Sequence, residues 1–413
     1  MKQVLDQVVN EGMKMEVFKN EPNFDKDVFQ QAIKDAVSKV NSNLNIFTDK
    51  FPDSATIDNV YPLNTHTASP GDEPIKEAGS NVGWTTSFWT GMLWLSYELT
   101  DDERYLRTLE NHIQNFKERT EKEIDINTHD LGFLYSLSCV AAYKVTGNEA
   151  AKSAALTAAD LMMRRYVEAA GIFQAWGDMN NPEERGRMII DCLMNLPLLY
   201  WASEVTGKDI YKDCAYRHAQ NALKYIVRED GTTYHTYFFD TETGAPKFGR
   251  TAQGYSDDSC WARGQAWGIY GFALSYIYTK DEKFLEMSKT LANYFLNRSP
   301  EDLVVYWDLI FQDGSGEERD SSSSAIAVCG LLELAKHLPE SEEKQYYLNA
   351  ANMILKSLYE NYSTRNDEKS NALILHGVYG KPFNFGVDEG NLWGDYFYFE
   401  ALARVTKNWN LYW

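Results

Sequence analysis

One short phrase recurs along the chain and limits the possible folds more than any other feature. Each of its six copies ends an apolar helical pattern, and the first five also open a new one. The copies are Leu99–Asp101, Val145–Gly147, Val205–Gly207, Tyr278–Lys280, Leu338–Glu340 and Val405–Lys407. We therefore predict that these phrases are tight turns between consecutive helices.

The spacing of the turns predicts the architecture. Together with a helix expected from Asp27 to Val40, the pattern gives about twelve helices in six consecutive pairs. The copies are roughly 45 to 75 residues apart, longer and less even than solenoid repeats, so insertions should enter on one side. We predict an all-α (α/α)6 barrel of six helical hairpins, a single domain over 1–413 with residues 1–25 as an N-terminal extension. An open superhelix is the alternative. One small β-hairpin insertion is expected at Thr232–Phe239, turning at Thr241–Ala245.

The charge and the cysteines exclude several classes of protein. A formal net charge of −20 disfavours nucleic acids and anionic membranes, which attract an excess of Lys and Arg. Neither a signal peptide nor a membrane span is evident, so we expect a cytoplasmic protein that binds no nucleic acid and no membrane. The five cysteines form no CxxC pair, which predicts buried thiols rather than disulfides or a zinc site.

The long connections carry the unusual residues. Each leads into a helix that ends at a turn phrase, so in a barrel all six connections would gather at one mouth. They contain NVGWTTSFW, INTHDLGF, RMIIDCLMN, YSDDSCWARGQAW, RDSSSSAIAVCG and VDEGNLWGDYFY. We predict that this mouth is the functional site.

Asp191 is the strongest catalytic candidate. Residues 188–190 and 192–194 are apolar, and Pro197 fits the first turn of a helix that begins shortly before it. Asp191 should therefore lie at a helix entrance in apolar surroundings, where burial raises a carboxyl pKa and a helix N-terminus lowers it. A buried, hydrogen-bonded structural Asp is the alternative reading.

Other carboxylates enter the same mouth. Asp130 is the candidate partner of Asp191, although Thr128 and Asp130 could merely cap a helix. Asp320, which precedes four serines, and Asp395 have the pattern of capping or structural residues. A pair of carboxylates permits glycoside hydrolysis, in which their separation determines inversion or retention.

Aromatic and donor side chains indicate a sugar ligand. Flat rings stack on the apolar faces of sugars, while guanidinium, amide and imidazole groups donate to hydroxyls and to a carboxylate. The candidates are Trp84, Phe88, Trp89, Trp176, Trp261, Trp267 and Tyr379, with Arg263, Gln253, His129 and His235 as donors. No phosphate loop, metal-ligand spacing or nucleophilic triad stands out, so neither a metal nor another cofactor is expected.

Taken together, the motifs resemble glycoside hydrolase family 88, the unsaturated glucuronyl hydrolases, from about residue 83 to residue 398. The resemblance rests on GWTTSFWTG, THDLGF, IIDCLMN, QGYSDDSCWARGQAW and HGVYGKPFNFGVDEGNLWGDYF. It implies hydration of the 4,5-unsaturated uronate that polysaccharide lyases leave at a non-reducing end. Asp191 matches the general acid/base, which protonates C4 and then takes a proton from the water that adds at C5.

The same resemblance assigns roles to the other candidates. Asp130 matches the second essential carboxylate, and Arg263 is expected to bind the substrate carboxylate. The positions that match the lining of the site are His129, Trp84, Trp176, His235, Gln253, Trp261, Trp267 and Tyr379. The expected partner is an unsaturated oligosaccharide, and the expected state is a monomer or a weak homodimer.

Departures from the family pattern bear on specificity. Members that accept sulfated glycosaminoglycan disaccharides carry Ser and Lys between the HGVY and GVDEGN phrases, and Arg just before QGYSDD. Here those places hold Gly380, Phe383, Phe385 and Ala252, none with a hydrogen-bonding side chain. Lys381 could compensate in part. We therefore expect a preference for unsulfated substrates.

Three alternative functions fit parts of the pattern. Unsaturated rhamnogalacturonyl hydrolases share the barrel and the chemistry, but Gln265 and Ala266 favour the glucuronyl side. Sugar epimerases also use (α/α)6 barrels, but they need paired bases, often histidines. A helical-repeat scaffold for a protein partner would leave the one-sided clustering of Asp, Trp and Arg without a cause.

Overall fold

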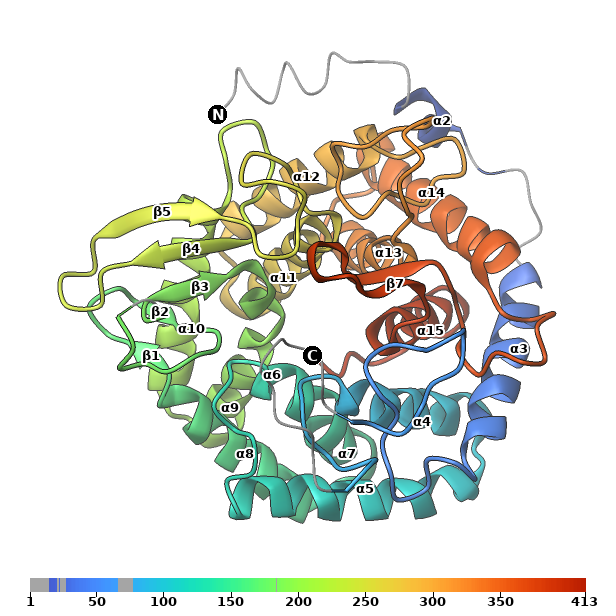
Figure 1. Cartoon of the computed structure of the whole chain (residues 1–413), viewed down its shortest axis with the longest axis horizontal. Coiled ribbons are helices and arrows are strands. Elements are labelled where there is room, and N and C mark those ends of the chain that lie inside the picture. Colours follow the sequence, from blue (N-terminus) through green and yellow to red (C-terminus); the bar gives the residue numbers. More distant parts are fainter. Residues whose placement is uncertain (1–14, 21, 23–26, 66–76, 183) are drawn as a thin grey trace.

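Paired helices form two concentric rings in the computed structural model, which describes residues 15–20, 22, 27–65, 77–182 and 184–413 (Figure 1). The inner helices are α4 (Thr86–Thr100), α6 (Leu131–Tyr135) with α7 (Ala141–Thr146), α9 (Leu196–Thr206), α11 (Ala262–Thr279), α13 (Ser321–Lys336) and α15 (Leu392–Thr406). The outer helices are α3 (Asp27–Asn43), α5 (Glu103–Glu121), α8 (Glu149–Met163), α10 (Asp209–Asn221), α12 (Glu282–Asn297) and α14 (Glu342–Ser357).

The inner ring is closed. Each inner helix packs against the next in chain order, and α15 packs against α4. Each outer helix contacts the inner helix of its own pair, with α3 against α15. The predicted all-α (α/α)6 barrel is therefore confirmed, and the open superhelix is excluded.

The pattern of apolar residues in each helix explains whether it lies in the inner or the outer ring. Helix α11 is apolar on all sides, and every residue from Ala262 to Ser275 is buried. Helix α5 is amphipathic, and its buried positions recur every three or four residues, including Tyr105, Leu109 and Ile113. A helix that is apolar all round needs protein on every side, whereas an amphipathic helix can face water.

The turn phrases end the inner helices as predicted. The terminal threonine hydroxyl donates to the carbonyl four residues earlier at Thr100, Thr146, Thr206, Thr279 and Thr406. The next residue adopts the left-handed conformation at Asp101, Gly147, Gly207 and Lys280, which stops the helix. The Leu338–Glu340 phrase follows α13, which ends two residues before it at Lys336.

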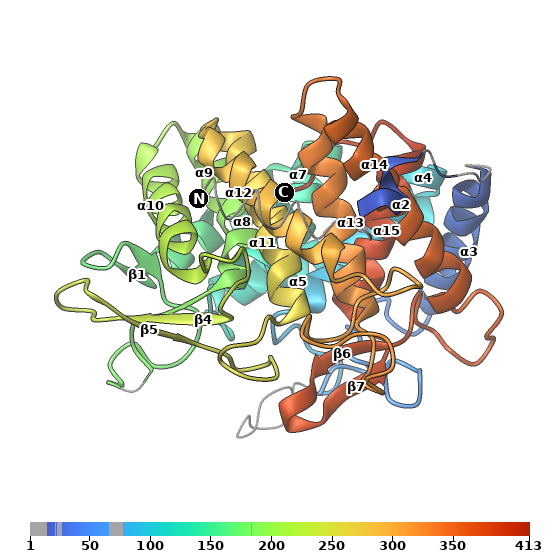
Figure 2. The same cartoon turned by 90° about the horizontal axis from the view of Figure 1, so that it is seen from above.

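Short strands gather at the opposite end of the barrel from the α9–α10 and α13–α14 turns (Figure 2). The predicted hairpin is present, but its first strand begins at Thr236 rather than Thr232. Further short strands are present, two pairs of them local and one strand, β3 (Arg187–Ile189), paired with the hairpin from a distant part of the chain. The sheets are β1 (Tyr166–Val167) with β2 (Ile172–Phe173); β3 (Arg187–Ile189) with β4 (Thr236–Phe239) and β5 (Pro246–Arg250); and β6 (Gly377–Gly380) with β7 (Phe385–Glu389).

Irregular helices and the chain ends complete the fold. The irregular segments are η1 (Ser136–Val140), η2 (Ile190–Met194), η3 (Ala222–Ile226), η4 (Leu358–Tyr362) and η5 (Lys381–Phe383). Helix α2 (Met15–Lys19) packs against α14, while 1–14, 21 and 23–25 of the predicted extension lie outside the described residues. All five cysteines are buried and free, as predicted. No helix in the described ranges has the length and apolarity needed to cross a membrane.

Candidate active site

Asp130 and Asp191 come together because two neighbouring inner helices begin side by side. Asp130 directly precedes α6, and Asp191 lies in the short 3-10 helix η2, ahead of α9. The first turn of α6 lies against the end of η2, where a Cβ on Gly132 would be only 2.2 Å from the Asn195 Cα. The absence of a side chain at Gly132 therefore allows the close approach of the two segments.

Asn195 links the two acidic residues, and the motif analysis missed it. Its amide Nδ2 donates to Asp130 Oδ1 at 3.3 Å and to the Asp191 carbonyl at 3.4 Å. Its Oδ1 accepts from the Phe133 backbone N–H at 2.7 Å. An Asn at a helix start looks like an ordinary cap, and only its place in IIDCLMN pointed to it.

Asp130 is held in a mostly buried position by its sequence neighbours. The Thr128 hydroxyl donates to its Oδ2 at 2.8 Å, and His129 Nε2 lies 3.3 Å from its Oδ1. Asp130 makes no side-chain cap on α6, so the capping alternative is not what the structure shows. Burial raises the pKa of Asp130 to about 6, although the hydrogen bonds from Thr128 and Asn195 oppose the rise.

Asp191 has the environment of a proton donor. Its Oδ1 is buried and has no hydrogen-bond partner among the described residues. Burial raises the pKa of Asp191 to about 7, and the negative charge of Asp130 adds to the rise, while the positive charge of Arg263 opposes it. A carboxyl with this pKa can give up and take back a proton near neutrality.

The two histidines beside the carboxyls are neutral. Burial lowers the pKa of both His129 and His235 to about 3. His235 Nδ1 accepts from the backbone N–H groups of Ala252 and Gln253 at 3.0 and 3.2 Å. Imidazoles of such low pKa are weak bases, which argues against the epimerase alternative.

Arg263 is buried and held in place by the protein around it. Its guanidinium donates to the Val378 carbonyl and, at 2.7 Å, to the Tyr379 carbonyl, and it lies 3.5 Å from Asp320. It also lies over the Trp261 ring, 4.4 Å from the ring centroid. Arg263 thus joins α11 to β6, and only 1% of it is exposed.

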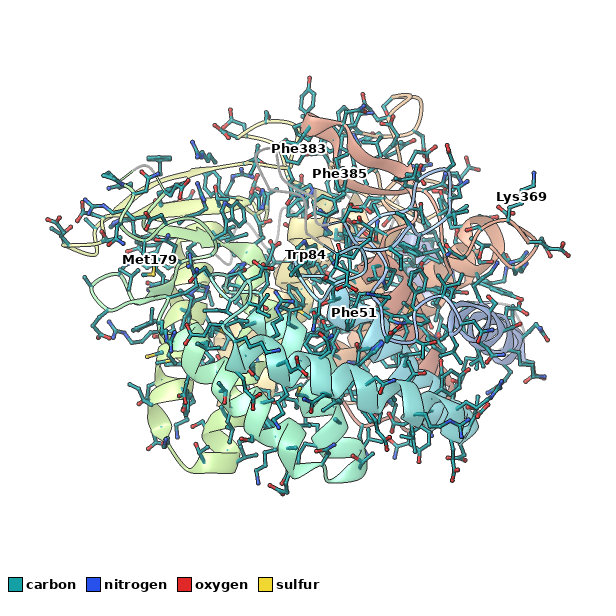
Figure 3. All side chains as sticks on the ribbon, turned by 60° about the horizontal axis from the view of Figure 1, so that its bottom comes forward. Phe51, Trp84, Met179, Lys369, Phe383 and Phe385 are labelled. Atoms are coloured by element: carbon teal, nitrogen blue, oxygen red, sulfur yellow. The ribbon has the colours of Figure 1, made fainter. Side chains whose placement is uncertain are left out.

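The predicted aromatic residues divide into two groups. Trp84 is partly exposed and donates from Nε1 to the Tyr379 hydroxyl at 2.8 Å, and 40% of Trp176 is exposed. Figure 3 shows Trp84 below the segment that carries Phe383 and Phe385. Fully or almost fully buried are Phe88, Trp89, Trp261 and Trp267. The first group offers ring faces at the mouth, and the second group supports it from the core.

Three further predicted side chains are structural or paired. Asp320 caps α13 through the Ser322 backbone N–H, as expected. Asp395 accepts from the Ile374 N–H at 3.0 Å and the Tyr61 hydroxyl at 3.0 Å, also as expected. Lys381 is ion-paired with Glu318. In the described part of the chain, no cluster of three His, Cys, Asp or Glu residues could hold a metal ion.

A barrel of paired helices with a protonatable buried carboxyl, a second carboxylate and ring faces at one mouth defines a helical-barrel glycosidase. A family model for Glycosyl Hydrolase Family 88 matches residues 59–410. The chain therefore belongs to this family. The predicted family and the predicted enzyme class, a glycoside hydrolase acting on unsaturated uronides, are thereby confirmed.

Relatives of known structure or function agree with this family. The unsaturated chondroitin disaccharide hydrolase of Streptococcus pneumoniae is 46% identical over 399 residues, 96% of this chain and 97% of that protein. The unsaturated glucuronyl hydrolase of Bacillus sp. strain GL1 is 44% identical over 387 residues, 94% of this chain and 99% of that protein. The crystal structure of the unsaturated glucuronyl hydrolase from Streptococcus agalactiae has a TM-score of 0.90 at 44% identity, covering 98% of both chains.

Proposed function

We propose that this chain is an unsaturated glucuronyl hydrolase that releases a 4,5-unsaturated uronic acid from the non-reducing end of lyase-generated oligosaccharides. The observation that carries the proposal is the Asp191 carboxyl, whose Oδ1 is buried without a hydrogen-bond partner among the described residues and whose pKa is raised to about 7. Asp130 beside it has the lower pKa and is the group that stays charged.

The chemistry needs one carboxyl that changes protonation state twice. Asp191 gives its proton to C4, and the positive charge that develops at C5 is shared with the ring oxygen. Water adds at C5 and gives one proton to the Asp191 carboxylate, which restores the acid. The hemiketal then opens and releases the neighbouring sugar. Asp130, held by Thr128 and Asn195, orients ring hydroxyls and raises the pKa of Asp191.

The remaining candidates contribute in different ways. Trp84 and Trp176 present ring faces to the sugar. Tyr379 is buried and accepts from Trp84, and Gln253 donates to the Tyr379 carbonyl at 2.8 Å. Arg263 opposes the rise in the pKa of Asp191 through its charge, and two of its N–H groups donate to backbone carbonyls. Binding of the substrate carboxylate by Arg263 stays a prediction. The cytoplasmic location, the single-domain organisation and the monomeric or weakly dimeric state stay predictions.

The decisive experiment follows the conjugated double bond. Incubation with an unsaturated, unsulfated chondroitin disaccharide should remove its ultraviolet absorbance, and solvent deuterium should appear at C4 of the product. Asp191→Asn should lower kcat by at least about a thousandfold, because it removes the proton donor. Asp258→Asn, at an exposed carboxylate of the same mouth, is the matched control and should be unaffected. Absorbance loss that survives Asp191→Asn would contradict the role of Asp191.

The preference for unsulfated substrates is part of the proposal. Gly380, Phe383, Phe385 and Ala252 supply no hydrogen-bonding side chains, and Lys381 is already paired with Glu318. A 6-sulfated chondroitin disaccharide should therefore turn over more slowly than the unsulfated one. Faster turnover of the sulfated disaccharide would overturn this expectation.

The choice of substrate distinguishes the proposed activity from the alternative, an unsaturated rhamnogalacturonyl hydrolase. Gln265, which favoured the glucuronyl side, is buried and donates to the carbonyls of Gly231 and Leu291 at 2.8 and 3.1 Å. This position therefore bears on packing and not on a substrate contact. An unsaturated rhamnogalacturonan disaccharide should be a poorer substrate than the chondroitin disaccharide, as judged by kcat/KM.

A further inference from the structure

Two arginines on one sheet face flank an aromatic ring at the edge of the site. Arg187 on β3 pairs with Phe238, and Arg250 on β5 pairs with Thr236, two residues before Phe238 on β4. Alternate residues of a strand share a face, so both guanidiniums lie on the Phe238 side. Their carbons are 5.5 and 4.7 Å from the centroid of that ring. Trp176 contacts Arg187 at 4.9 Å.

Neither guanidinium is neutralised within the part of the chain that the structure describes. No carboxylate oxygen lies within 4.0 Å of either group, and no described acceptor receives a hydrogen bond from either. Glu184 attracts Arg187 from further away, but its own carboxylate accepts from the Asp178 backbone N–H at 2.7 Å. With 60 acidic against 40 basic residues in the chain, an unpaired double positive charge is unusual and suits an anionic ligand.

Backbone contacts place this pair beside the catalytic residues. The Ala175 N–H donates to the Arg187 carbonyl, and the Ala175 carbonyl accepts from the His129 N–H at 2.9 Å. On β5, Arg250 is two residues before Ala252, whose N–H donates to His235. The patch is therefore continuous with the mouth that holds the two carboxyls.

The patch is nevertheless set apart from the reacting atoms. The cation that acts on Asp191 is Arg263, whereas the charge of Arg187 acts on His235. About 40% of Trp176 is exposed, so its ring can receive a sugar outside the innermost position. The chemistry fits a sugar further along the substrate than the one that is released.

We propose that Arg187, Arg250 and Trp176 form a second subsite for an anionic substituent on the retained part of the oligosaccharide. The guanidiniums bind the anion, and the indole covers the face of the sugar that carries it. This inference rests on the proposed function. The two guanidiniums could bind either a sulfate ester on the adjacent sugar or the carboxylate of the next uronic acid. The expected preference for unsulfated substrates favours the carboxylate.

The test compares an unsulfated, unsaturated chondroitin disaccharide with the corresponding tetrasaccharide, which carries a second uronate. The wild-type protein should have the lower KM for the tetrasaccharide. Arg250→Ala, at an exposed position, should raise the KM for the tetrasaccharide about tenfold and leave the KM for the disaccharide and both kcat values unchanged. Arg187→Gln should act in the same direction. Arg250→Lys should keep part of the gain, because it retains charge without the planar fork.

Lys247→Ala is the matched control, since Lys247 is a cation on the same strand that already pairs with Asp240 at 3.5 Å. A rise in KM for a 6-sulfated disaccharide, instead of the tetrasaccharide, would support the subsite with sulfate as its anion. Equal effects of Arg250→Ala on all substrates, or an equal effect of Lys247→Ala, would overturn the subsite. Failure of the proposed function is distinct, because the wild-type protein would then turn over no unsaturated uronide.

Discussion

The Asn195 amide tunes Asp130, whose charge acts directly on Asp191. By donating to Asp130 it opposes the effect of burial, which raises the pKa of that carboxyl to about 6. A charged Asp130 in turn raises the pKa of Asp191, which is about 7. Between these values Asp130 is charged while Asp191 keeps its proton, so activity should be highest there, falling as Asp130 is protonated at lower pH and as Asp191 is deprotonated at higher pH.

Asn195→Ala should narrow this pH range. Without the donated hydrogen bond the pKa of Asp130 rises, whereas Asp191 still loses its proton at a pH where Asp130 is already charged. The acidic limb of the kcat/KM profile should move up by about one pH unit, and the alkaline limb should stay in place. Asn148→Ala, which removes the cap of α8, is the control for lost stability and should leave both limbs in place. An unchanged acidic limb in Asn195→Ala would contradict the effect of the Asn195 hydrogen bond on Asp130.

For single residues, the sequence predicted which side chains belong to the candidate site but not which groups each side chain contacts. Asp191 and Asp130 were predictable because apolar neighbours and helix starts are local features. Arg263 has its acceptors at Val378 and Tyr379, 115 and 116 residues away, so the occupation of its donors could not be foreseen. The burial of Trp267 likewise depends on its contact with Phe133, from another helical pair.

Among the elements, the contact between α6 and η2 determines how the two carboxyls lie. Gly132→Ala should push these segments apart, because its Cβ would meet the Asn195 backbone at 2.2 to 2.3 Å. We expect kcat to fall at least about a hundredfold, since a displacement of about 1 Å has that effect on a positioned catalytic group. Gly147→Ala is the control, because Gly147 follows α7 and an added Cβ there would meet no other atom. At a φ of +71° the substitution should cost about 1 kcal/mol of stability and little activity. Equal activities would contradict the role of the contact.

The elements differ in how far the sequence predicts them. The turn phrases carry their own explanation, since each threonine bonds a carbonyl one turn back and the following residue leaves the helical region. Strand β3 has three residues and acquires its structure from β4, almost 50 residues later. Such short strands have too little periodicity to detect, because their pairing and not their local pattern makes them strands.

Across the whole molecule, closure of the ring brings together a buried group of charges that no local pattern could indicate. Arg404 on α15 contacts Glu333 on α13 at 2.7 Å and Glu400 at 2.9 Å, and none of these side chains is more than 4% exposed. Glu400 also accepts from Tyr270 on α11 at 2.6 Å and from the Trp413 indole at 2.9 Å. The group therefore ties three inner helices to the last residue of the chain.

Arg404→Leu should destabilise the barrel strongly, because it leaves Glu400 buried without a cation and removes one of the cations beside Glu333. The expected loss is about 3–5 kcal/mol in the free energy of unfolding, measured by chemical denaturation at pH 7. In the wild-type protein Arg404 contributes to the lowered pKa of Glu333. The stability gained from a charged Glu333 is therefore present above the pKa of an unfolded Glu and is lost as the pH falls. The deficit of the variant should accordingly shrink towards pH 4, where Glu400 and Glu333 take up protons. Lys212→Ala, which removes an exposed ion pair with Asp209, is the control and should change the free energy of unfolding by less than about 0.5 kcal/mol. A similarly small change in Arg404→Leu would show that closure of the ring does not depend on these charges.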